Sequence, residues 1–167
     1  SGERSELMVK MAIPFAPLAG SNSPVCLGAT LALTSSASGT MPFTYSWEGP
    51  NMFASTDQNP DIAGFTSLAS GTYTVTVTNL CGSTNTSVVV VVKDAPSAVM
   101  ATNDGPVCLG TTLNLNVTSG GTAPFTYEWE GPNMFSSVSQ TPQVESVPLA
   151  NSGTYTVTVT NSCGSST

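Results

Sequence analysis

Apolar and polar side chains alternate along much of the chain with a period of two residues, which is typical of β-strands that bury one face. Three stretches of the first half show this alternation, 30–35, 43–48 and 72–78, and a fourth, 86–92, ends in consecutive valines. In 72–78 a tyrosine and two valines share one face, and four threonines share the other. Gly-Pro-Asn and Gly-Ser turns separate the stretches, so we predict an all-β, Greek-key sandwich.

The chain repeats itself after 82 residues without a gap. The motif "PFTYSWEGPNMF" at 42–53 returns as "PFTYEWEGPNMF" at 124–135, and "SGTYTVTVTNLCGS" at 70–83 returns as "SGTYTVTVTNSCGS" at 152–165. This period is too long for a solenoid and suits tandem whole domains. We therefore predict a segment at 1–13, a first domain at 14–94 and a second domain at 95–167.

Residue spacing within each repeat is close to that of an immunoglobulin domain. Trp47 lies 12 residues after Ser35, and Tyr73 lies two residues before Val75, near the positions of the core tryptophan and the tyrosine corner. Ser35 and Val75 stand where that fold would carry its disulfide. The predicted core residues are Trp47, Trp129, Tyr73 and Tyr155.

Composition narrows the function. The net charge is −7 with only three basic residues, which argues against a nucleic-acid surface. The chain has no histidine, the usual general base and transition-metal ligand, and no apolar run long enough to span a membrane. Glu48 and Glu130 open turns after the tryptophans and have no second carboxylate at a fixed spacing. We expect no catalytic residue, no metal and no cofactor.

The run "PVCLGxTLxL…YxWEGPNMF…SGTYTVTVTNxCGS" resembles the tandem immunoglobulin-like repeats of large secreted adhesins and filaments of Bacteroidetes-type bacteria. The resemblance covers about 14–167, and its motifs belong to an architectural module. It implies export to the cell surface and a role in adhesion, gliding or biofilm.

Each repeat contains two cysteines, Cys26 and Cys81, then Cys108 and Cys163. In the first repeat, Cys26 precedes the predicted strand 30–35 and Cys81 lies in the turn before the valine run, and the second repeat matches this. These two places lie at opposite ends of an immunoglobulin sandwich. A seven-residue strand spans about 23 Å, whereas a disulfide requires Cα atoms within about 7 Å. We expect a Cys26–Cys163 bond across the domain junction. Disulfides within each domain and free thiols remain alternatives.

The register assigns a role to the first residues. The second repeat ends before the counterpart of the valine strand, and 82 residues back Val89 aligns with Leu7 and Val91 with Val9. We predict that segment 1–13 is a donor strand which fills the groove of the second domain in a neighbouring copy and builds a head-to-tail polymer. Cys108 of one copy would then meet Cys81 of the next. The side chains expected to face inward are Leu7, Val9, Met11 and Ile13.

Several alternatives remain open. The chain can be an excerpt of a longer repeat array, such as the stalk of a giant adhesin, or the segment can close onto its own second domain. An accessory carbohydrate-binding module is a third interpretation, in which exposed aromatic residues would stack on sugars. Two residues that follow the predicted strand 43–48, and their two counterparts in the second repeat, are candidates for lateral contacts: Met52, Phe53, Met134 and Phe135.

Overall fold

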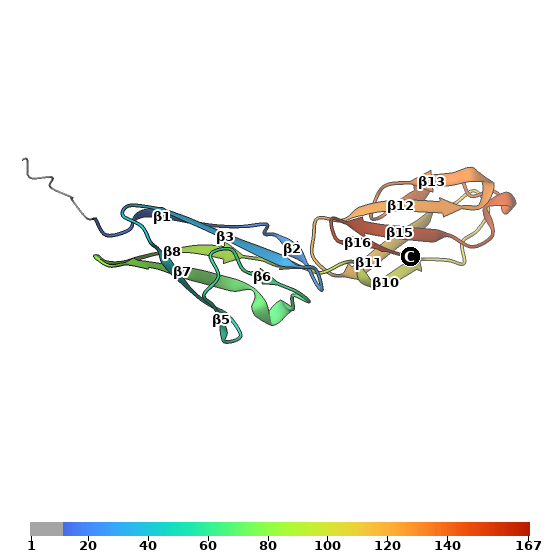
Figure 1. The fold of residues 1–167 in the computed structure, drawn as a ribbon. Helices are drawn as coiled ribbons and strands as arrows, with labels where there is room; N and C mark the ends of the chain where they lie inside the picture. Colours follow the sequence, from blue (N-terminus) through green and yellow to red (C-terminus); the bar gives the residue numbers. More distant parts are fainter. Residues whose placement is uncertain (1–11) are drawn as a thin grey trace, which may run out of the picture. The chain divides into compact units, whose positions relative to one another are not determined.

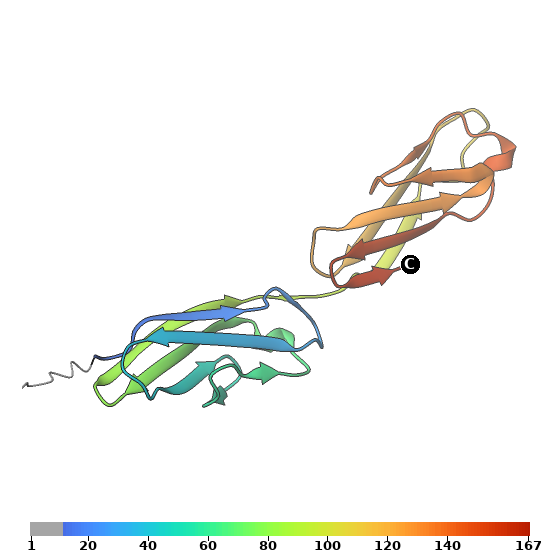
Figure 2. The same ribbon diagram turned by 45° about the horizontal axis from the view of Figure 1, so that its top comes forward.

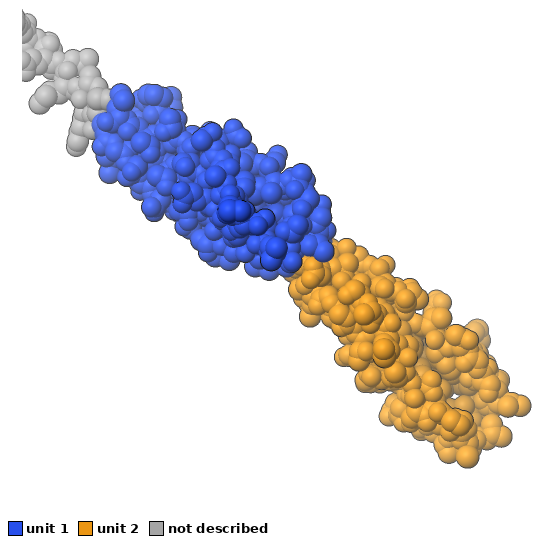
Figure 3. Space-filling view, turned by 90° about the horizontal axis from the view of Figure 1, so that it is seen from below, with its two compact units in different colours: residues 1–92 blue, residues 93–167 orange. Residues whose placement is uncertain are grey.

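The computed structural model describes residues 12–167, and the chain divides after Val92 into two compact units, 1–92 and 93–167 (Figure 3). Along the chain, this division lies two residues before the predicted domain boundary. The regular elements of the described residues are β-strands and three short 3-10 turns, so the predicted all-β class is confirmed. Most of segment 1–13 lies outside the described residues.

Unit 1 is a sandwich of two antiparallel sheets (Figures 1 and 2). One sheet has the order β1-β3-β6, with β1 (Phe15–Ser21), β3 (Leu31–Ser38) and β6 (Asp61–Ile62). The other has the order β5-β4-β7-β8, with β5 (Phe53–Ser55), β4 (Thr44–Gly49), β7 (Gly71–Asn79) and β8 (Gly82–Val90). The short strands β2 (Val25–Cys26) and β9 (Val92–Lys93) pair, and the turn η1 (Ser67–Ala69) precedes β7.

Unit 2 repeats this plan with a shorter last strand. One sheet has the order β10-β11-β14, with β10 (Ser97–Asn103), β11 (Leu113–Gly120) and β14 (Gln143–Val144). The other has the order β13-β12-β15-β16, with β13 (Phe135–Ser137), β12 (Thr126–Gly131), β15 (Thr156–Asn161) and β16 (Gly164–Ser166). The turns η2 (Pro132–Met134) and η3 (Leu149–Asn151) precede β13 and β15.

The alternating residues meet between the sheets as their pattern predicts. In unit 1, Trp47 and the inward side of β7 are fully buried, and the Trp47 indole N–H donates to the Gln58 carbonyl at 3.2 Å. Ser35, at the position of an immunoglobulin cysteine, is buried and donates its hydroxyl to the same carbonyl at 2.8 Å. Gln58 therefore satisfies both buried donors, which allows this core to do without a disulfide.

The predicted tyrosine corner is present in both units. The Tyr73 hydroxyl donates to the Ala69 carbonyl at 2.9 Å, and the Tyr155 hydroxyl donates to the Asn151 carbonyl at 3.0 Å. Burial raises the pKa of both phenols above the usual value for tyrosine. Trp47, Trp129 and Tyr73 are buried core residues as predicted, but Tyr155 is only half-buried.

The last strand of unit 1 begins earlier than its valine run suggests. We predicted it over 86–92, whereas β8 begins at Gly82 and pairs with β7 along its whole length, from Asn79 opposite Gly82 to Gly71 opposite Val90. The turn between the two strands contains only Leu80 and Cys81, and Gly82 has a φ of 143°. Because the turn is so short, β7 and β8 pair immediately after it, and the pairing includes the polar residues that precede the valines.

Candidate functional site

Strand β8 closes the core of unit 1 through its even-numbered residues. Val90 is 1% exposed, while Val89 is 65% and Val91 is 49% exposed. Val88 and Val92 are partly buried and pack against the same core. The strand that completes an immunoglobulin-like unit in this chain therefore turns its even positions inward.

The corresponding place in unit 2 is open along most of its length. The short strand β16 pairs only with the end of β15, from Asn161 opposite Gly164 to Val159 opposite Ser166 (Figure 1). Among residues 12–167, no strand lies beside the preceding part of β15 on this edge. In unit 1 the matching residues 71–76 pair with 85–90. Unit 2 therefore presents an unpaired strand edge next to its core.

Two hollows lie along this open edge, with volumes of about 360 and 230 Å³. Asn103, Gly153 and Tyr155 line both of them. Leu113 and Val147 contribute apolar surface to the larger hollow, and Trp129 lines the smaller one. We call the two together the unit 2 groove. Because Gly153 and Tyr155 match Gly71 and Tyr73, which pair with Val90 and Val88, the groove corresponds to the space that β8 fills in unit 1.

In unit 1 the residues that follow β8 also satisfy polar groups at the rim of the core. The Val92 N–H donates to the Ser70 hydroxyl at 3.1 Å, and the Val25 N–H donates to the Val91 carbonyl at 3.0 Å. Ser152 and Val107 hold the positions of Ser70 and Val25 in unit 2, and the described residues include no counterpart of Val91 or Val92 there. The groove thus has an apolar floor. At its rim it has polar groups that can form hydrogen bonds with the backbone of a bound strand.

One polar group of the groove differs from unit 1. Asn151 is 9% exposed, and its side-chain Oδ1 has no hydrogen-bond partner among residues 12–167. It lines the larger hollow, and the matching residue of unit 1 is the small apolar Ala69. A buried acceptor without a partner is unfavourable, typically by about 1–3 kcal/mol. Asn151 is therefore a group that a bound segment would satisfy.

A second feature escaped sequence reasoning: an asparagine holds the chain where it enters each unit. In unit 1 the Asn79 Nδ2 donates to the carbonyls of Ala12 and Thr40, at 2.8 and 2.7 Å, while its Oδ1 accepts the Cys81 N–H at 2.9 Å. Every polar atom of the amide is thereby engaged. The repeated motif Asn-x-Cys-Gly was the available signal, but only the fold shows what the side chain reaches.

Asn161 makes the same three contacts in unit 2. Its Nδ2 donates to the carbonyls of Asp94 and Thr122, at 2.7 and 2.9 Å, and its Oδ1 accepts the Cys163 N–H at 2.8 Å. We call these two residues the asparagine clamps. The prolines that follow the clamped residues, Pro14 and Pro96, are both buried. Each unit therefore fixes its own entry segment at a defined residue.

The predicted donor residues fall at and before this entry. Leu7, Val9 and Met11 lie outside the described residues. Ile13 is 50% exposed at the base of unit 1, next to the clamped Ala12, and a Cβ added at Gly82 would lie 3.1 Å from its Cγ2. Ile13 therefore lies in the entry segment of unit 1, and its place in a donor strand stays a prediction.

The cysteines divide into two classes. Cys26 and Cys163 are disulfide-bonded, whereas Cys81 and Cys108 are exposed free thiols. Each unit thus holds one bonded and one free cysteine, and this excludes the alternative of a disulfide within either unit. Disulfides are characteristic of proteins outside the reducing cytosol.

The candidate lateral residues also separate into two kinds. Met52 and Met134 are each 95% exposed and have positive φ values of 59° and 58°. Phe53 and Phe135 are instead half-buried and stack edge-on against the corner tyrosines, with ring centroids 5.4 and 5.3 Å apart. Their role is to cover the core, so of the predicted lateral set only the methionines stand free.

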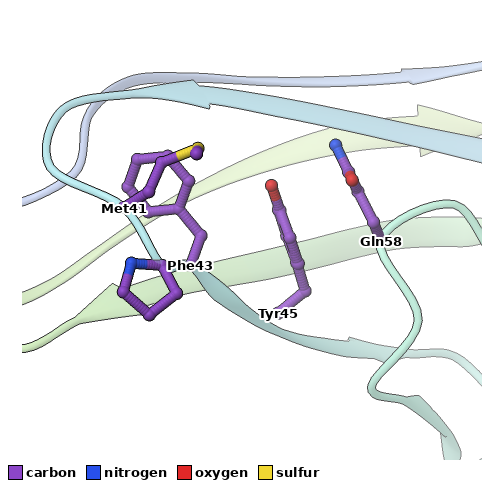
Figure 4. Close-up of a pocket in the computed structure, with 5 residues that line it drawn as sticks. Met41, Phe43, Tyr45 and Gln58 are labelled. Atoms are coloured by element: carbon purple, nitrogen blue, oxygen red, sulfur yellow. The ribbon is translucent and has the colours of Figure 1, made fainter.

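One hollow of unit 1 bears on the carbohydrate-binding alternative. It measures about 520 Å³ and is lined by Met41, Pro42, Phe43, Tyr45 and Gln58 (Figure 4). The Gln58 amide nitrogen donates to the Ser35 carbonyl at 2.9 Å, so it serves the fold. Trp47 is fully buried in the core. The Trp47 ring is therefore not available to stack on a bound sugar.

Other chemistry has little basis in the described residues. Among residues 12–167, no cluster of three or more His, Cys, Asp or Glu side chains is arranged to bind a metal. No helix in this part of the chain has the length and apolar character that a membrane crossing requires. Glu48 and Glu130 are exposed.

Two sandwiches with buried tryptophans and tyrosine corners define a tandem immunoglobulin-like protein. Solved structures share this fold: the titin I-band fragment I67–I69 has a TM-score of 0.72 at 19% identity, over 94% of this chain and 64% of that one. Drosophila OTK extracellular domains 3–5 give 0.59 at 18%, over 94% and 59%, and the mouse nectin-like molecule 4 ectodomain gives 0.53 at 18%, over 93% and 62%.

The chain spans about three-fifths of the length of these structures. No protein-family model matches the chain, and no curated protein matches it. The structural likeness establishes the immunoglobulin-like fold.

Proposed function

We propose that the protein is a structural subunit of an extracellular surface filament of a bacterium, assembled head to tail by strand donation and used in adhesion or biofilm. The observation that carries this proposal is the unit 2 groove, which is open where β8 fills its counterpart in unit 1. The occupant we propose is the segment before residue 12 of a second copy. Donor and acceptor are then different surfaces of one subunit, so the contact does not close and a fibre grows.

The energetic requirement is moderate. Full burial of an aliphatic side chain of valine size contributes about 1.5–3 kcal/mol. The apolar groups that the donor strand buries, together with a backbone ladder along β15, oppose an association cost of roughly 4–15 kcal/mol. Strand addition can therefore hold subunits together, and a covalent link would make the fibre durable.

The cysteines supply such a link under this proposal. We propose that Cys26 and Cys163 bond to each other within one chain. In the fibre the same junction would recur between subunits, where Cys108 of one copy meets Cys81 of the next. The exposure of both free thiols supports this pairing. Replacement of Cys81 by serine should then abolish reducible multimers while leaving non-covalent fibres.

A stalk segment within a longer repeat protein is the second candidate. The same groove favours it, because a strand from further along one polypeptide would fill the groove equally well. The known tandem immunoglobulin-like structures, such as the titin fragment, show that this fold occurs in linear series. The two candidates differ only in whether the donor strand belongs to another chain.

Two variants test the proposal. The first lacks residues 1–11. The second carries a copy of residues 86–94 after Thr167, which aligns with Asn85, so that the copy continues the register and fills the groove in cis. We expect fibres from the intact chain, by electron microscopy, and monomers from both variants. A control copy with aspartate at its three inward valine positions should leave assembly intact.

The outcomes separate the candidates. Fibres from the variant that lacks residues 1–11 would refute strand donation by this segment. An intact chain that stays monomeric, while the appended copy raises the stability of unit 2, would favour the stalk segment instead. Either result is read directly from sedimentation velocity and thermal unfolding.

A further inference from the structure

We infer that the donor strand enters the unit 2 groove in the register of β8, with Glu6, Met8 and Lys10 facing the core and Lys10 bound to Asn151. This inference rests on the proposed function, and it reverses the face that the apolar pattern of the segment predicts. Leu7 and Val9 would then lie on the outer face of the strand. Three features support this register: the buried face of β8, the asparagine clamps and the residues that line the groove.

The inward face follows from β8 and the 82-residue offset. Val88, Val90 and Val92 turn toward the core of unit 1, and they align with Glu6, Met8 and Lys10. The outward residues at the end of β8 and just after it are themselves apolar, since Val89 and Val91 are substantially exposed. Apolar residues at 7 and 9 therefore do not indicate an inward face, because the strand of unit 1 carries them on the outside too.

The clamps limit any shift of register. Val92 is held by Ser70 in unit 1 and Asp94 is held by Asn161 in unit 2, so one residue separates the two anchored positions. Ala12 is held by Asn79 in the same manner as Asp94. If a fibre repeats the junction found along the chain, residue 10 takes the place of Val92. If the donor strand shifted by one residue, every inward side chain would face outward. The number of residues between the position held by the serine hydroxyl and the clamped residue would also change from one to none or to two.

The groove suits a donor with polar inward residues. Its larger hollow has room for a methionine at the position of the fully buried Val90, and methionine adapts to irregular cavities. Near the end of the groove, Asn151 replaces Ala69 and Asn103 replaces Ser21. Asn151 therefore gives the groove a buried polar group that its filled counterpart lacks.

Lys10 and Asn151 form the specific pair. The Lys10 N–H would donate to the Ser152 hydroxyl, as the Val92 N–H donates to Ser70. Val92 packs against the core cluster that contains Ala69 in unit 1, so the Lys10 side chain would lie toward Asn151, whose buried Oδ1 lacks a partner in the described residues. The ammonium group supplies the missing donor while the aliphatic stem covers apolar surface.

The pair also discriminates between the two strands of the chain. A valine-rich strand like β8 would leave the Asn151 acceptor buried and unpaired, whereas Lys10 would find only Ala69 in the groove of unit 1. Both mismatches are unfavourable, which favours the heterologous contact over an exchange of β8 strands between copies.

Cysteine cross-linking reads the register directly. Thr72 lies opposite Val89 in unit 1, so Thr154 should lie opposite Leu7 of the neighbouring copy. Cα atoms of directly opposed residues are about 4.5–5.5 Å apart, within disulfide range. In a background of C81S and C108S, we would oxidise L7C/T154C and its controls E6C/T154C and M8C/T154C, and examine non-reducing gels.

We expect a ladder of covalent multimers from L7C/T154C alone. A ladder from either control instead would overturn the inferred register and leave strand donation standing. Absence of a ladder from all three, with fibres still visible, would also overturn the register. Absence of both ladders and fibres would refute the proposed function together with the inference.

A double-mutant cycle tests the specific pair in the full chain. K10V or N151A alone should raise the critical concentration for assembly about tenfold to a hundredfold, the effect of losing a hydrogen bond to a charged group. The double variant, which restores the valine–alanine pair of unit 1, should recover much of this loss. Additive losses in the double variant would show that the two residues do not interact and would overturn the pairing.

Discussion

Replacement of Asn161 by alanine removes one asparagine clamp and gives a direct measure of its contribution. The side chain makes three hydrogen bonds that tie together the entry segment at Asp94, the turn at Thr122 and the last hairpin at Cys163. Each contributes about 0.5–1.5 kcal/mol net. We expect unit 2 to lose about 2–4 kcal/mol of unfolding free energy, because no other side chain takes over these contacts.

The two tryptophans provide the assay, since Trp47 lies in the core of unit 1 and Trp129 in that of unit 2. In a W47F background, the fluorescence of Trp129 reports on unit 2 alone. With urea m-values of about 1–3 kcal/mol/M, the expected loss lowers the midpoint by roughly 1–3 M. For a domain of this size, the melting temperature should fall by roughly 10–20 °C.

The repeat offers matched controls for this prediction. N79A, followed through Trp47 in a W129F background, removes the same three contacts from unit 1 and should lose a similar amount. S165A, at an exposed position of β16, should be nearly neutral. A loss below about 0.5 kcal/mol in N161A, the size of an ordinary surface substitution, would refute the assignment of the clamp as a structural anchor.

Two further predictions concern acid stability and lateral contacts. Hydrogen bonds from the Asn114 side chain and backbone lower the pKa of Asp104, so its stabilising effect is present above the unfolded-state pKa and is lost as pH falls through the lower folded-state value. D104N should flatten the acid limb of the unit 2 stability profile, as measured by Trp129 fluorescence between neutral pH and about pH 3. M52S and M134S should leave the unfolding midpoints unchanged and reduce side-by-side bundling of fibres in light scattering; unaltered bundling would argue against methionine contacts.

Sequence pattern was sufficient where a rule of local spacing applied. The alternation around Trp47 and Tyr73 predicted which residues are buried, and the 12-residue and two-residue spacings predicted the tyrosine corner that the hydrogen bonds confirm. The 82-residue repeat transferred those assignments to Trp129 and Tyr155. Tyr155 is nevertheless only half-buried, because its burial depends on a neighbouring strand and not on its own spacing.

Sequence pattern failed where a residue's role depends on a distant part of the chain. The valine run of 86–92 has apolar residues on both faces, so its composition does not tell which face is inward. Likewise, nothing local to Asn79 shows that it binds Ala12, 67 residues away. Phe53 looked like an exposed loop residue until the fold placed it against Tyr73.

The sequence by itself determined the all-β class and the buried tryptophans, which follow from the two-residue period of a strand. It also determined the two repeats and their register without a gap, which follow from identity at a fixed offset. Only the tertiary structure decided which face of β8 is buried, which cysteines are bonded and where a groove remains open. These depend on which strands and turns lie side by side after folding, and an unpartnered group such as the Asn151 Oδ1 exists only once the surrounding chain has excluded water from it.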